Sequence, residues 1–148
     1  MDIKISRALF TQSKELLAMA ESFHLEDGHP LAETSGAALE GAIRGTPLAE
    51  AYVVEQNGTL IGYFVLCFTW SIEFGGLVVI LDDLYLKKEF RNQGIGSLIL
   101  SKVKEIAIVK DAVQIFLEVE HANQRAMQLY QRNGFSIRER FMMEFFPD

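Results

Sequence analysis

The sequence has little of what marks secreted, membrane or nucleic-acid-binding proteins. It holds one cysteine, Cys67, so no disulfide can form within the chain, and its start lacks the layout of a signal peptide. We therefore expect a cytoplasmic location. The longest apolar stretches, such as 60–68 and 77–81, are far shorter than the ~20 residues of a membrane-spanning helix, so we expect no membrane partner. Fourteen Lys and Arg against 20 Asp and Glu give a net charge of −6, which argues against nucleic acid as a partner.

What is present is typical of one globular domain. The 148 residues match the usual size of a single domain, and 49% are hydrophobic while 23% are charged. This balance excludes a disordered or low-complexity chain. The acidic charge favours a cationic partner, either a small molecule or a peptide.

The first half of the chain predicts a strand, two helices and a hairpin. Alternating residues predict a strand over 2–6, and Thr11 is expected to cap the helix that follows. A second helix is expected over 31–44. Residues 51–55 and 60–70 then flank Asn57-Gly58, the strongest short hairpin signal, and should pair antiparallel.

The second half predicts a strand–helix–strand unit and a closing segment. A near-continuous apolar strand over 77–86 is expected to be central and buried on both faces. A helix over 97–110, a strand over 113–119, a helix from Asn123 to Gly134 and closing strands over 135–137 and 140–146 should follow. The order predicts a mixed α/β fold: a mainly antiparallel sheet with one parallel strand–helix–strand crossover and helices on both faces.

A glycine turn, Gln93-Gly94-Ile95-Gly96, lies between a predicted strand end and a helix start. Unpaired backbone N–H groups and the helix dipole make such a turn a site for phosphate. A dinucleotide-binding fingerprint would need a third glycine where Ile99 stands, and a P-loop would need Gly-Lys-Ser/Thr where the chain has Gly-Ser-Leu. A tight turn without a ligand is the remaining alternative.

Two motifs resemble the signatures of the GNAT superfamily of N-acetyltransferases. The turn Arg91-Asn92-Gln93-Gly94-Ile95-Gly96 is similar to the family's Arg/Gln-x-x-Gly-x-Gly/Ala, and residues 123–135 are similar to its Asn…Ala…Leu-Tyr…Gly-Phe segment. The resemblance implies a GNAT-like fold formed by one domain, residues 1–148. It also implies acetyl-CoA as co-substrate without a metal, and direct attack of a primary amine on the thioester in a ternary complex.

The resemblance also implies which residues bind the coenzyme. Its pyrophosphate would rest on the backbone amides of residues 92–97, and its pantetheine arm would lie along residues 84–86, with the thioester carbonyl near the amide of Leu84. The full set comprises Leu84, Tyr85, Leu86, Arg91, Asn92, Gln93, Gly94, Ile95, Gly96, Ser97, Asn123, Ala126 and Tyr130. An alternative for Arg91 is a surface salt bridge with Glu89 or Glu105. Asn123 could also cap its own helix.

Two residues are predicted to be catalytic. The resemblance gives Tyr130 the role of the acid that protonates the departing thiolate; the alternative is a core aromatic residue on an amphipathic helix. Asp82 and Asp83 interrupt an otherwise apolar strand, and buried acids are rare unless they have partners or a task. Adjacent strand residues point to opposite faces, so at most one of them should face the substrate directly. The resemblance to the polyamine and diamine acetyltransferase branch implies that Asp82 helps to bind the cationic acceptor, and we prefer Asp82; the alternative for Asp83 is an acid kept for hydrogen bonds within the sheet or loop.

Further residues are candidates for the acceptor site. Asp82 and Asp83 are joined by Glu26 and His29 in an expected acceptor wall, and by Trp70 and Glu73 as an aromatic–acidic pocket for an ammonium group. The alternative for Trp70 and Glu73 is a hairpin end packed on the core. The His and acidic residues over 24–29 match no metal-ligand spacing, so no metal is expected.

The acceptor is expected to be a small cationic amine. The segment 81–86 resembles the polyamine and diamine acetyltransferase branch of the family. The alternatives are acetylation of a protein N-terminus or lysine, and a non-catalytic module that binds acyl-CoA. The apolar segment 141–146 suits either a partner strand in a homodimer or a core edge.

Overall fold

The computed structural model describes residues 2–147, which form two compact units, residues 2–118 and residues 119–147. The first unit contains the β-sheet and three α-helices, and the second contains one α-helix and the C-terminal segment.

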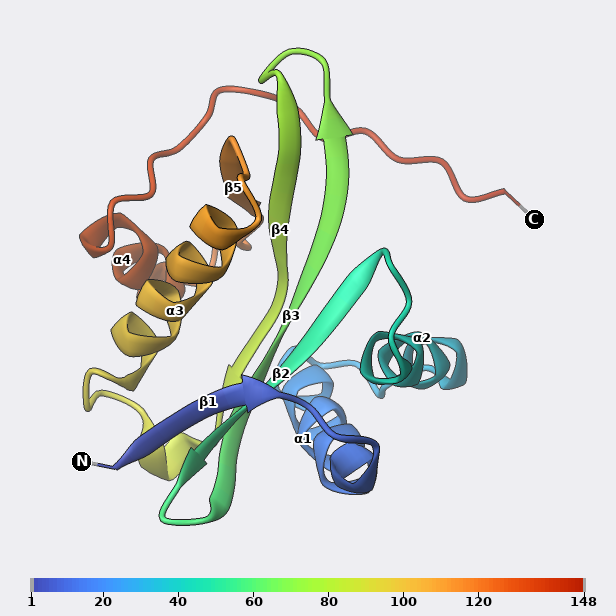
Figure 1. Cartoon of the computed structure of the whole chain (residues 1–148), viewed down its shortest axis with the longest axis vertical. Coiled ribbons are helices and arrows are strands. Elements are labelled where there is room, and N and C mark those ends of the chain that lie inside the picture. The colour runs from blue at the N-terminus through green and yellow to red at the C-terminus, as the bar shows by residue number, and fades with distance from the viewer. Residues whose placement is uncertain (1, 148) are drawn as a thin grey trace. The chain divides into compact units, whose positions relative to one another are not determined.

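The sheet of the first unit has five strands in the order β1-β2-β3-β4-β5 (Figure 1). The strands are β1 Ile3–Arg7, β2 Ala49–Gln56, β3 Thr59–Ser71, β4 Gly76–Leu86 and β5 Gln114–Leu117. The first three pairings are antiparallel and β4 pairs with β5 in parallel. The predicted mixed sheet is confirmed. The expectation that the apolar strand is central was wrong, because β3 holds the middle and β4 lies between β3 and the short β5.

The β2–β3 hairpin turns where the sequence predicts. Asn57 and Gly58 have φ angles of 51° and 82°, both in the left-handed region, as a two-residue turn of this twist requires. The turn fixes the register of the strands, in which Val53 faces Tyr63.

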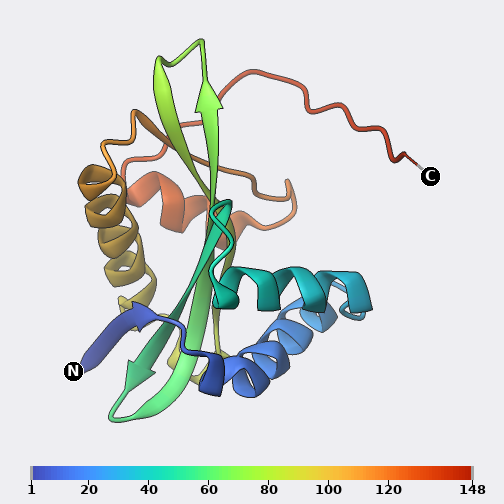
Figure 2. The ribbon, with the colours of Figure 1, turned by 45° about the vertical axis from the view of Figure 1, so that its right-hand side comes forward.

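Helices cover both faces of the sheet (Figure 2). The helices α1, Ser13–Glu26, and α2, Glu33–Arg44, lie on one face, and α3, Ile95–Val109, lies on the other. Short 3₁₀ turns, η1 Phe10–Gln12 and η2 Lys88–Phe90, precede α1 and α3.

The start of α1 differs from the prediction. Thr11 lies inside η1 and caps nothing, and the residue at the N-cap is Gln12. The Gln12 side chain accepts a hydrogen bond from the amide of Leu9 at 2.9 Å, and the Ser13 hydroxyl donates to the carbonyl of Phe10 at 2.8 Å. These two bonds close the 3₁₀ turn and replace the expected threonine cap.

The core lies on both sides of the sheet. On the α1–α2 side, Leu16 and Tyr63 are fully buried, and on α3 the apolar stripe includes Ile99 and Val103. Burial of each large apolar side chain contributes about 1.5–3 kcal/mol before chain entropy is counted. This packing fixes β4 and the start of α3, the two elements that carry the predicted site.

In the second unit, α4 covers Gln124–Arg132, and Gly134, whose φ is 91°, follows the C-cap residue Asn133. The expected closing strands over 135–137 and 140–146 were wrong: residues 135–147 form no strand. A strand is stabilised by hydrogen bonds to a neighbouring strand, which a local alternating pattern cannot supply. Among the residues that the structure describes, no helix has both the length and the apolar character to cross a membrane.

Candidate active site

A β-bulge places Asp82 at a break in the sheet. Leu81 faces Leu66 and Asp83 faces Val65, so Asp82 has no partner on β3. Such an extra residue bends a strand and redirects its side chains. The break depends on the register of two strands, which the sequence of one strand does not reveal.

Beyond the bulge, β4 separates from β5. Their parallel pairing covers residues 78–81 of β4 against residues 114–117 of β5, while β4 continues to Leu86. Within residues 2–118, the segment 82–86 has no strand on its β5 side. An open edge of this kind can pair with an amide-bearing extended ligand. Leu84, Tyr85 and Leu86, which were predicted to lie along pantetheine, belong to this edge.

The turn before α3 has the backbone that an anion site needs. Asn92 has a φ of 61° and Gly94, the N-cap of α3, has a φ of 82°. A Cβ on Gly94 would meet no atom within 4 Å, so backbone conformation, and not crowding, favours glycine here. The first hydrogen bond into the helix runs from the amide of Leu98 to the carbonyl of Gly94, and no side chain caps the helix.

The amides of Ile95 and Gly96 precede that first bond, in the first turn of α3. Helical N–H groups at this position have no partner within the helix, and together with the helix dipole they attract negative charge. The side chain of Gln93 donates to the carbonyl of Glu89 at 3.0 Å and so braces the turn. These fixed donors fit a diphosphate.

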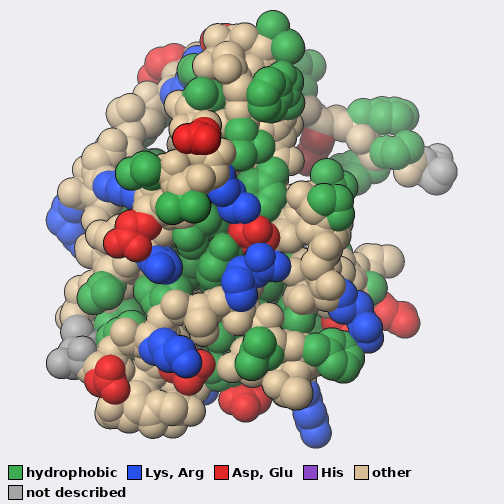
Figure 3. Space-filling view, viewed as in Figure 1, with side chains coloured by type: hydrophobic (Ala, Val, Ile, Leu, Met, Phe, Trp, Pro, Cys, Tyr) green, Lys and Arg blue, Asp and Glu red, His purple; other side chains and the backbone are tan. Residues whose placement is uncertain are grey.

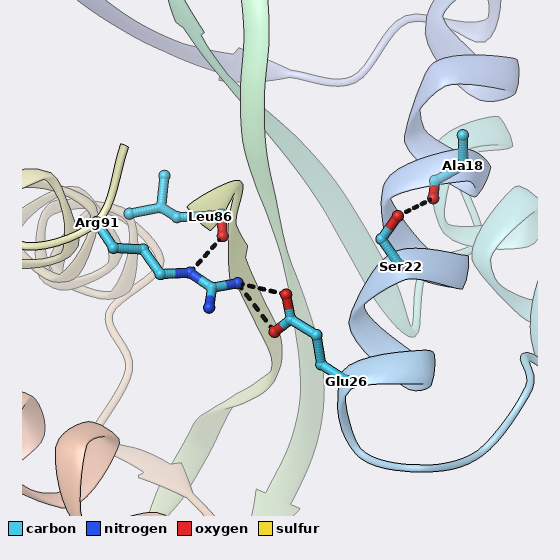
Figure 4. A network of polar contacts seen from close by, with 5 residues as sticks. All are labelled: Ala18, Ser22, Glu26, Leu86 and Arg91. Carbon is cyan, nitrogen blue, oxygen red and sulfur yellow. Dashed lines mark hydrogen bonds and ion pairs between the residues drawn. The ribbon is translucent and has the colours of Figure 1, made fainter. Parts of the chain in front are cut away.

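Arg91 is engaged by Glu26, and not by Glu89 or Glu105 as the sequence suggested (Figure 4). Its Nη2 donates to both carboxylate oxygens of Glu26 at 2.9 Å, and its Nε donates to the carbonyl of Leu86 at 2.7 Å. The guanidinium carbon lies 5.5 Å from the centre of the Tyr85 ring. Glu26 was predicted to contact the acceptor. Both of its carboxylate oxygens instead accept hydrogen bonds from Arg91, which precedes the glycine turn.

The two aspartates of the bulge have different environments. Asp82 is exposed, which corrects the expectation of a buried acid, whereas Asp83 is partly buried. Asp83 Oδ2 accepts a hydrogen bond from the hydroxyl of Tyr63 at 3.0 Å. Burial raises the pKa of Asp83; the Tyr63 bond opposes the shift but does not cancel it.

The sequence did not single out Tyr63, which is one of several aromatic and β-branched residues in the predicted strand over 60–70. In the structure it is fully buried, and its ring lies 6.5 Å from Phe23 and 6.1 Å from Tyr85. Phe23 lies 5.6 Å from Tyr85. Three rings from α1, β3 and β4 thus form one aromatic cluster, and its Tyr63 hydroxyl contacts Asp83.

Trp70 and Glu73 lie away from the bulge, at the tip of the β3–β4 hairpin. Hydrophobic side chains gather on the surface at the top of the view in Figure 3, where this hairpin ends. Trp70 faces Leu77, five positions along β4 from Asp82, or about 17 Å of strand. Trp70 is 71% exposed. The structure does not bring these two residues together with the aspartates.

His29 lies just after α1, on an exposed stretch. Its amide donates to the carbonyl of His24 and the amide of Gly28 donates to that of Leu25, both at 3.0 Å. With Gly28 at a φ of 86°, these bonds form a Schellman motif that ends α1. The Asp27-Gly28 pair is thus explained by helix termination.

A cavity of about 650 Å³ lies between α1 and the connection that follows β4. Its lining includes Glu15, Ser22 and Glu26 from α1, Tyr85 from the end of β4, and Lys87 and Glu89 from the connection. Across residues 2–147, no group of three or more His, Cys, Asp or Glu side chains is arranged to hold a metal ion.

In the second unit, the predicted residues organise α4 itself. The Asn123 side chain accepts a hydrogen bond from the amide of Ala126 at 3.2 Å, which confirms the capping alternative. The amide of Phe135 donates to the carbonyl of Tyr130 at 3.0 Å, and the two rings lie 6.0 Å apart. Burial raises the pKa of the Tyr130 phenol, which keeps the hydroxyl protonated at neutral pH.

The sequence of this chain is similar to those of known acetyltransferases. The profile of the acetyltransferase (GNAT) family matches residues 14–135. The thialysine N-epsilon-acetyltransferase of Bos taurus is 42% identical over 79 residues, which cover 53% of this chain and 46% of the bovine protein. The match thus spans about half the length of that relative.

Solved structures share the fold at low identity. A possible acetyltransferase from Clostridium difficile 630 superposes with a TM-score of 0.88 at 18% identity, covering 99% of this chain and 98% of that one. The structure of AAC(6')-Iy in complex with the bisubstrate analog CoA-S-monomethyl-acetylneamine superposes with a TM-score of 0.82 at 16% identity over the full length of both chains. With the bulged strand, the open edge and the glycine turn in place, the family match identifies the chain as a member of the GNAT acetyltransferase family.

Proposed function

We propose that this chain transfers the acetyl group of acetyl-CoA to the primary amine of a small cationic molecule. The observation that carries the proposal is the continuity of β4: one strand leaves its neighbour at the bulge, offers an open edge over 82–86, and leads through η2 into the anion-binding turn before α3. An extended ligand with amide groups at one end and a diphosphate at the other matches these two features.

In this reaction the amine nitrogen attacks the thioester carbonyl carbon. A C–N bond forms, the C–S bond breaks, and the sulfur leaves with the bonding electrons. The ammonium form must first lose a proton because only the free amine has a lone pair. We assign that task, directly or through water, to the Asp83 carboxylate. The sequence favoured Asp82, but burial and the hydrogen bond from Tyr63 hold Asp83 in one geometry while Asp82 is exposed.

Two groups complete the proposal. The rings of Phe23, Tyr63 and Tyr85 form one cluster, in which the Tyr63 hydroxyl contacts Asp83, and such a cluster suits an alkyl ammonium ion, whose charge is attracted to ring faces. Tyr130 is assigned as the acid that protonates the leaving thiolate, and the second proton that the nitrogen loses as the amide forms returns through solvent to the phenol. The name of the bovine relative, which specifies acetylation of an amine on a lysine-like side chain, supports a small cationic acceptor.

The test is a panel of polyamines, diamines, aminoglycosides, thialysine and peptides, each mixed with acetyl-CoA while free thiol is measured. We expect turnover with small cationic amines. Asp83→Asn should reduce kcat by roughly 100-fold, the usual scale for a general base, and the neighbouring Asp82→Asn should have a much smaller effect. Turnover with peptides alone would overturn the acceptor class, and tight coenzyme binding without any transfer would favour a non-catalytic module.

A further inference from the structure

A single ion pair connects α1 to the coenzyme turn. Glu26, in the last turn of α1, and Arg91, the residue after η2, are separated by 65 positions in the sequence. Their side chains are 26% and 22% exposed, so the pair is partly shielded from water. Ion pairs that are partly buried and charge-assisted at two oxygens are worth more than exposed ones.

The position of the guanidinium is fixed from three directions. Glu26 accepts a hydrogen bond from Nη2, and the carbonyl of Leu86 accepts one from Nε (Figure 4). The ring of Tyr85 lies beside the guanidinium, 5.5 Å from its carbon. Leu86 is the last residue of β4, and Arg91 immediately precedes the residues that form the anion turn. The arginine therefore connects the end of the open strand to the start of the turn, and the Glu26 carboxylate is its ion-pair partner.

Apolar packing does not fill the space beside this pair. The cavity of about 650 Å³ between α1 and the β4–η2 connection is open to solvent, and Glu26 and Tyr85 both contribute to its lining. Where packing is incomplete, directional polar contacts have a larger share in holding two elements together. The ion pair is thus placed to limit movement of the connection relative to α1.

We propose that Glu26 is a positioning residue for coenzyme binding: through Arg91 it holds the β4–α3 connection in the form that presents its backbone amides to the diphosphate. Glu26 itself touches no part of the coenzyme in this scheme. The inference rests on the proposed function, because it concerns the affinity of the same coenzyme site.

The sign of the effect separates positioning from simple electrostatics. Glu26 is a negative charge near a site for a polyanion, so Coulomb repulsion alone predicts that its neutralisation tightens binding. Positioning predicts the opposite: without the carboxylate, the guanidinium and the turn gain freedom that the coenzyme must then remove on binding.

The experiment measures coenzyme A affinity by calorimetry for the unaltered protein, Glu26→Gln, Arg91→Gln and the double variant. We expect Glu26→Gln to weaken binding by about fivefold, as loss of a partly exposed charge-assisted bond would, and the double variant to bind no more weakly than Arg91→Gln. Glu21→Gln, an exposed carboxylate on the same helix, should leave affinity nearly unchanged.

A second readout does not depend on binding. Hydrogen exchange of the apo protein should show faster exchange over residues 91–96 in Glu26→Gln and not in Glu21→Gln. Tighter or unchanged coenzyme binding by Glu26→Gln, additive losses in the double variant, or unchanged exchange over 91–96 would each overturn the positioning role. Failure of the proposed function has a different signature, since the unaltered protein would then neither bind coenzyme A nor transfer acetyl groups.

Discussion

The charged form of Asp83 lowers the stability of the folded protein because the carboxylate is partly buried. A residue kept only for stability would not be expected to have this effect. Burial raises the pKa of Asp83, so between the carboxyl pKa of the unfolded chain and that of the folded chain the native state binds more protons than the unfolded state. Stability from this group therefore falls as pH rises through that window, and the penalty is complete above the carboxyl pKa of the folded chain. The Tyr63 hydrogen bond offsets only part of the cost.

Replacement of Asp83 by Asn should stabilise the protein while it impairs catalysis. At pH 7 the neutral amide avoids burial of a charge, and its oxygen can still accept the Tyr63 hydrogen bond, so we expect the Tm to rise by roughly 1–3 °C. At pH values below the unfolded carboxyl pKa the gain should vanish. Thermal unfolding at both pH values checks this, with Asp82→Asn as the exposed control; a Tm that drops at pH 7 would contradict it.

Tyr130 allows a second test at the same scale. Its phenol has a raised pKa and is protonated at neutral pH, as an acid must be before it donates. Tyr130→Phe should lower kcat by roughly 100-fold and leave coenzyme affinity close to normal, because the ring contact with Phe135 is retained. Steady-state kinetics with calorimetry make the comparison, and unchanged turnover would remove Tyr130 from the mechanism.

The sequence predicted residues whose role depends on local backbone and missed those whose role depends on distant contacts. The glycine turn and the Asn123 cap each depend on residues that lie within a few positions of one another in the sequence, and both are found in the structure. The Glu26–Arg91 pair joins residues 65 positions apart, and the Tyr63–Asp83 bond joins residues 20 apart. No periodicity or propensity encodes such partners.

At the scale of elements, the close approach of β3 to the end of β4 shapes the coenzyme strand. Gly62 faces Leu86, and a Cβ at Gly62 would overlap the carbonyl oxygen of Tyr85 and the side chain of Leu86. The backbone of β4 cannot move aside as easily as a flexible side chain can. Residues 82–86 therefore keep their position only while residue 62 has no side chain.

Gly62→Ala should therefore displace the end of β4. We expect a loss of about 1–3 kcal/mol in the free energy of unfolding, the usual cost of overpacking, together with weaker coenzyme binding. Gly41→Ala is the matched control: its added Cβ, in the interior of α2, would meet no atom within 4 Å, so it should raise stability by about 0.5–1 kcal/mol. Denaturant unfolding gives both values, and a neutral Gly62→Ala would contradict the crowding.

Elements whose signals are local were predicted well. The Asn57-Gly58 hairpin and the strand–helix–strand unit agree with the structure, whereas the bulge at Asp82 arises from the register between β3 and β4 and is invisible in one strand. The Thr11 cap failed because a 3₁₀ turn closed by Gln12 and Ser13 precedes α1. The closing strands failed because an alternating apolar pattern does not provide a pairing partner.

At the scale of the whole molecule, the C-terminal segment exposes large apolar side chains. Phe141 is 99% exposed and Phe145 is 86% exposed. Soluble proteins seldom leave several such residues uncovered, and a second copy of the chain would cover them in a homodimer. We expect light scattering to give the mass of a dimer, and Phe141→Ser combined with Phe145→Ser to shift it towards the monomer. A monomeric mass for the unaltered protein at all concentrations would exclude this assembly.

The proposed acetyl transfer depends on backbone amides at the start of α3 that bind the diphosphate of the coenzyme. Amide chemical shifts of the isotope-labelled protein, titrated with coenzyme A and with pantetheine, test this most directly because pantetheine lacks the diphosphate. The account predicts that the amides of Gly94, Ile95 and Gly96 shift with coenzyme A and remain in place with pantetheine. Shifts at these amides with both compounds, or with neither, would contradict it.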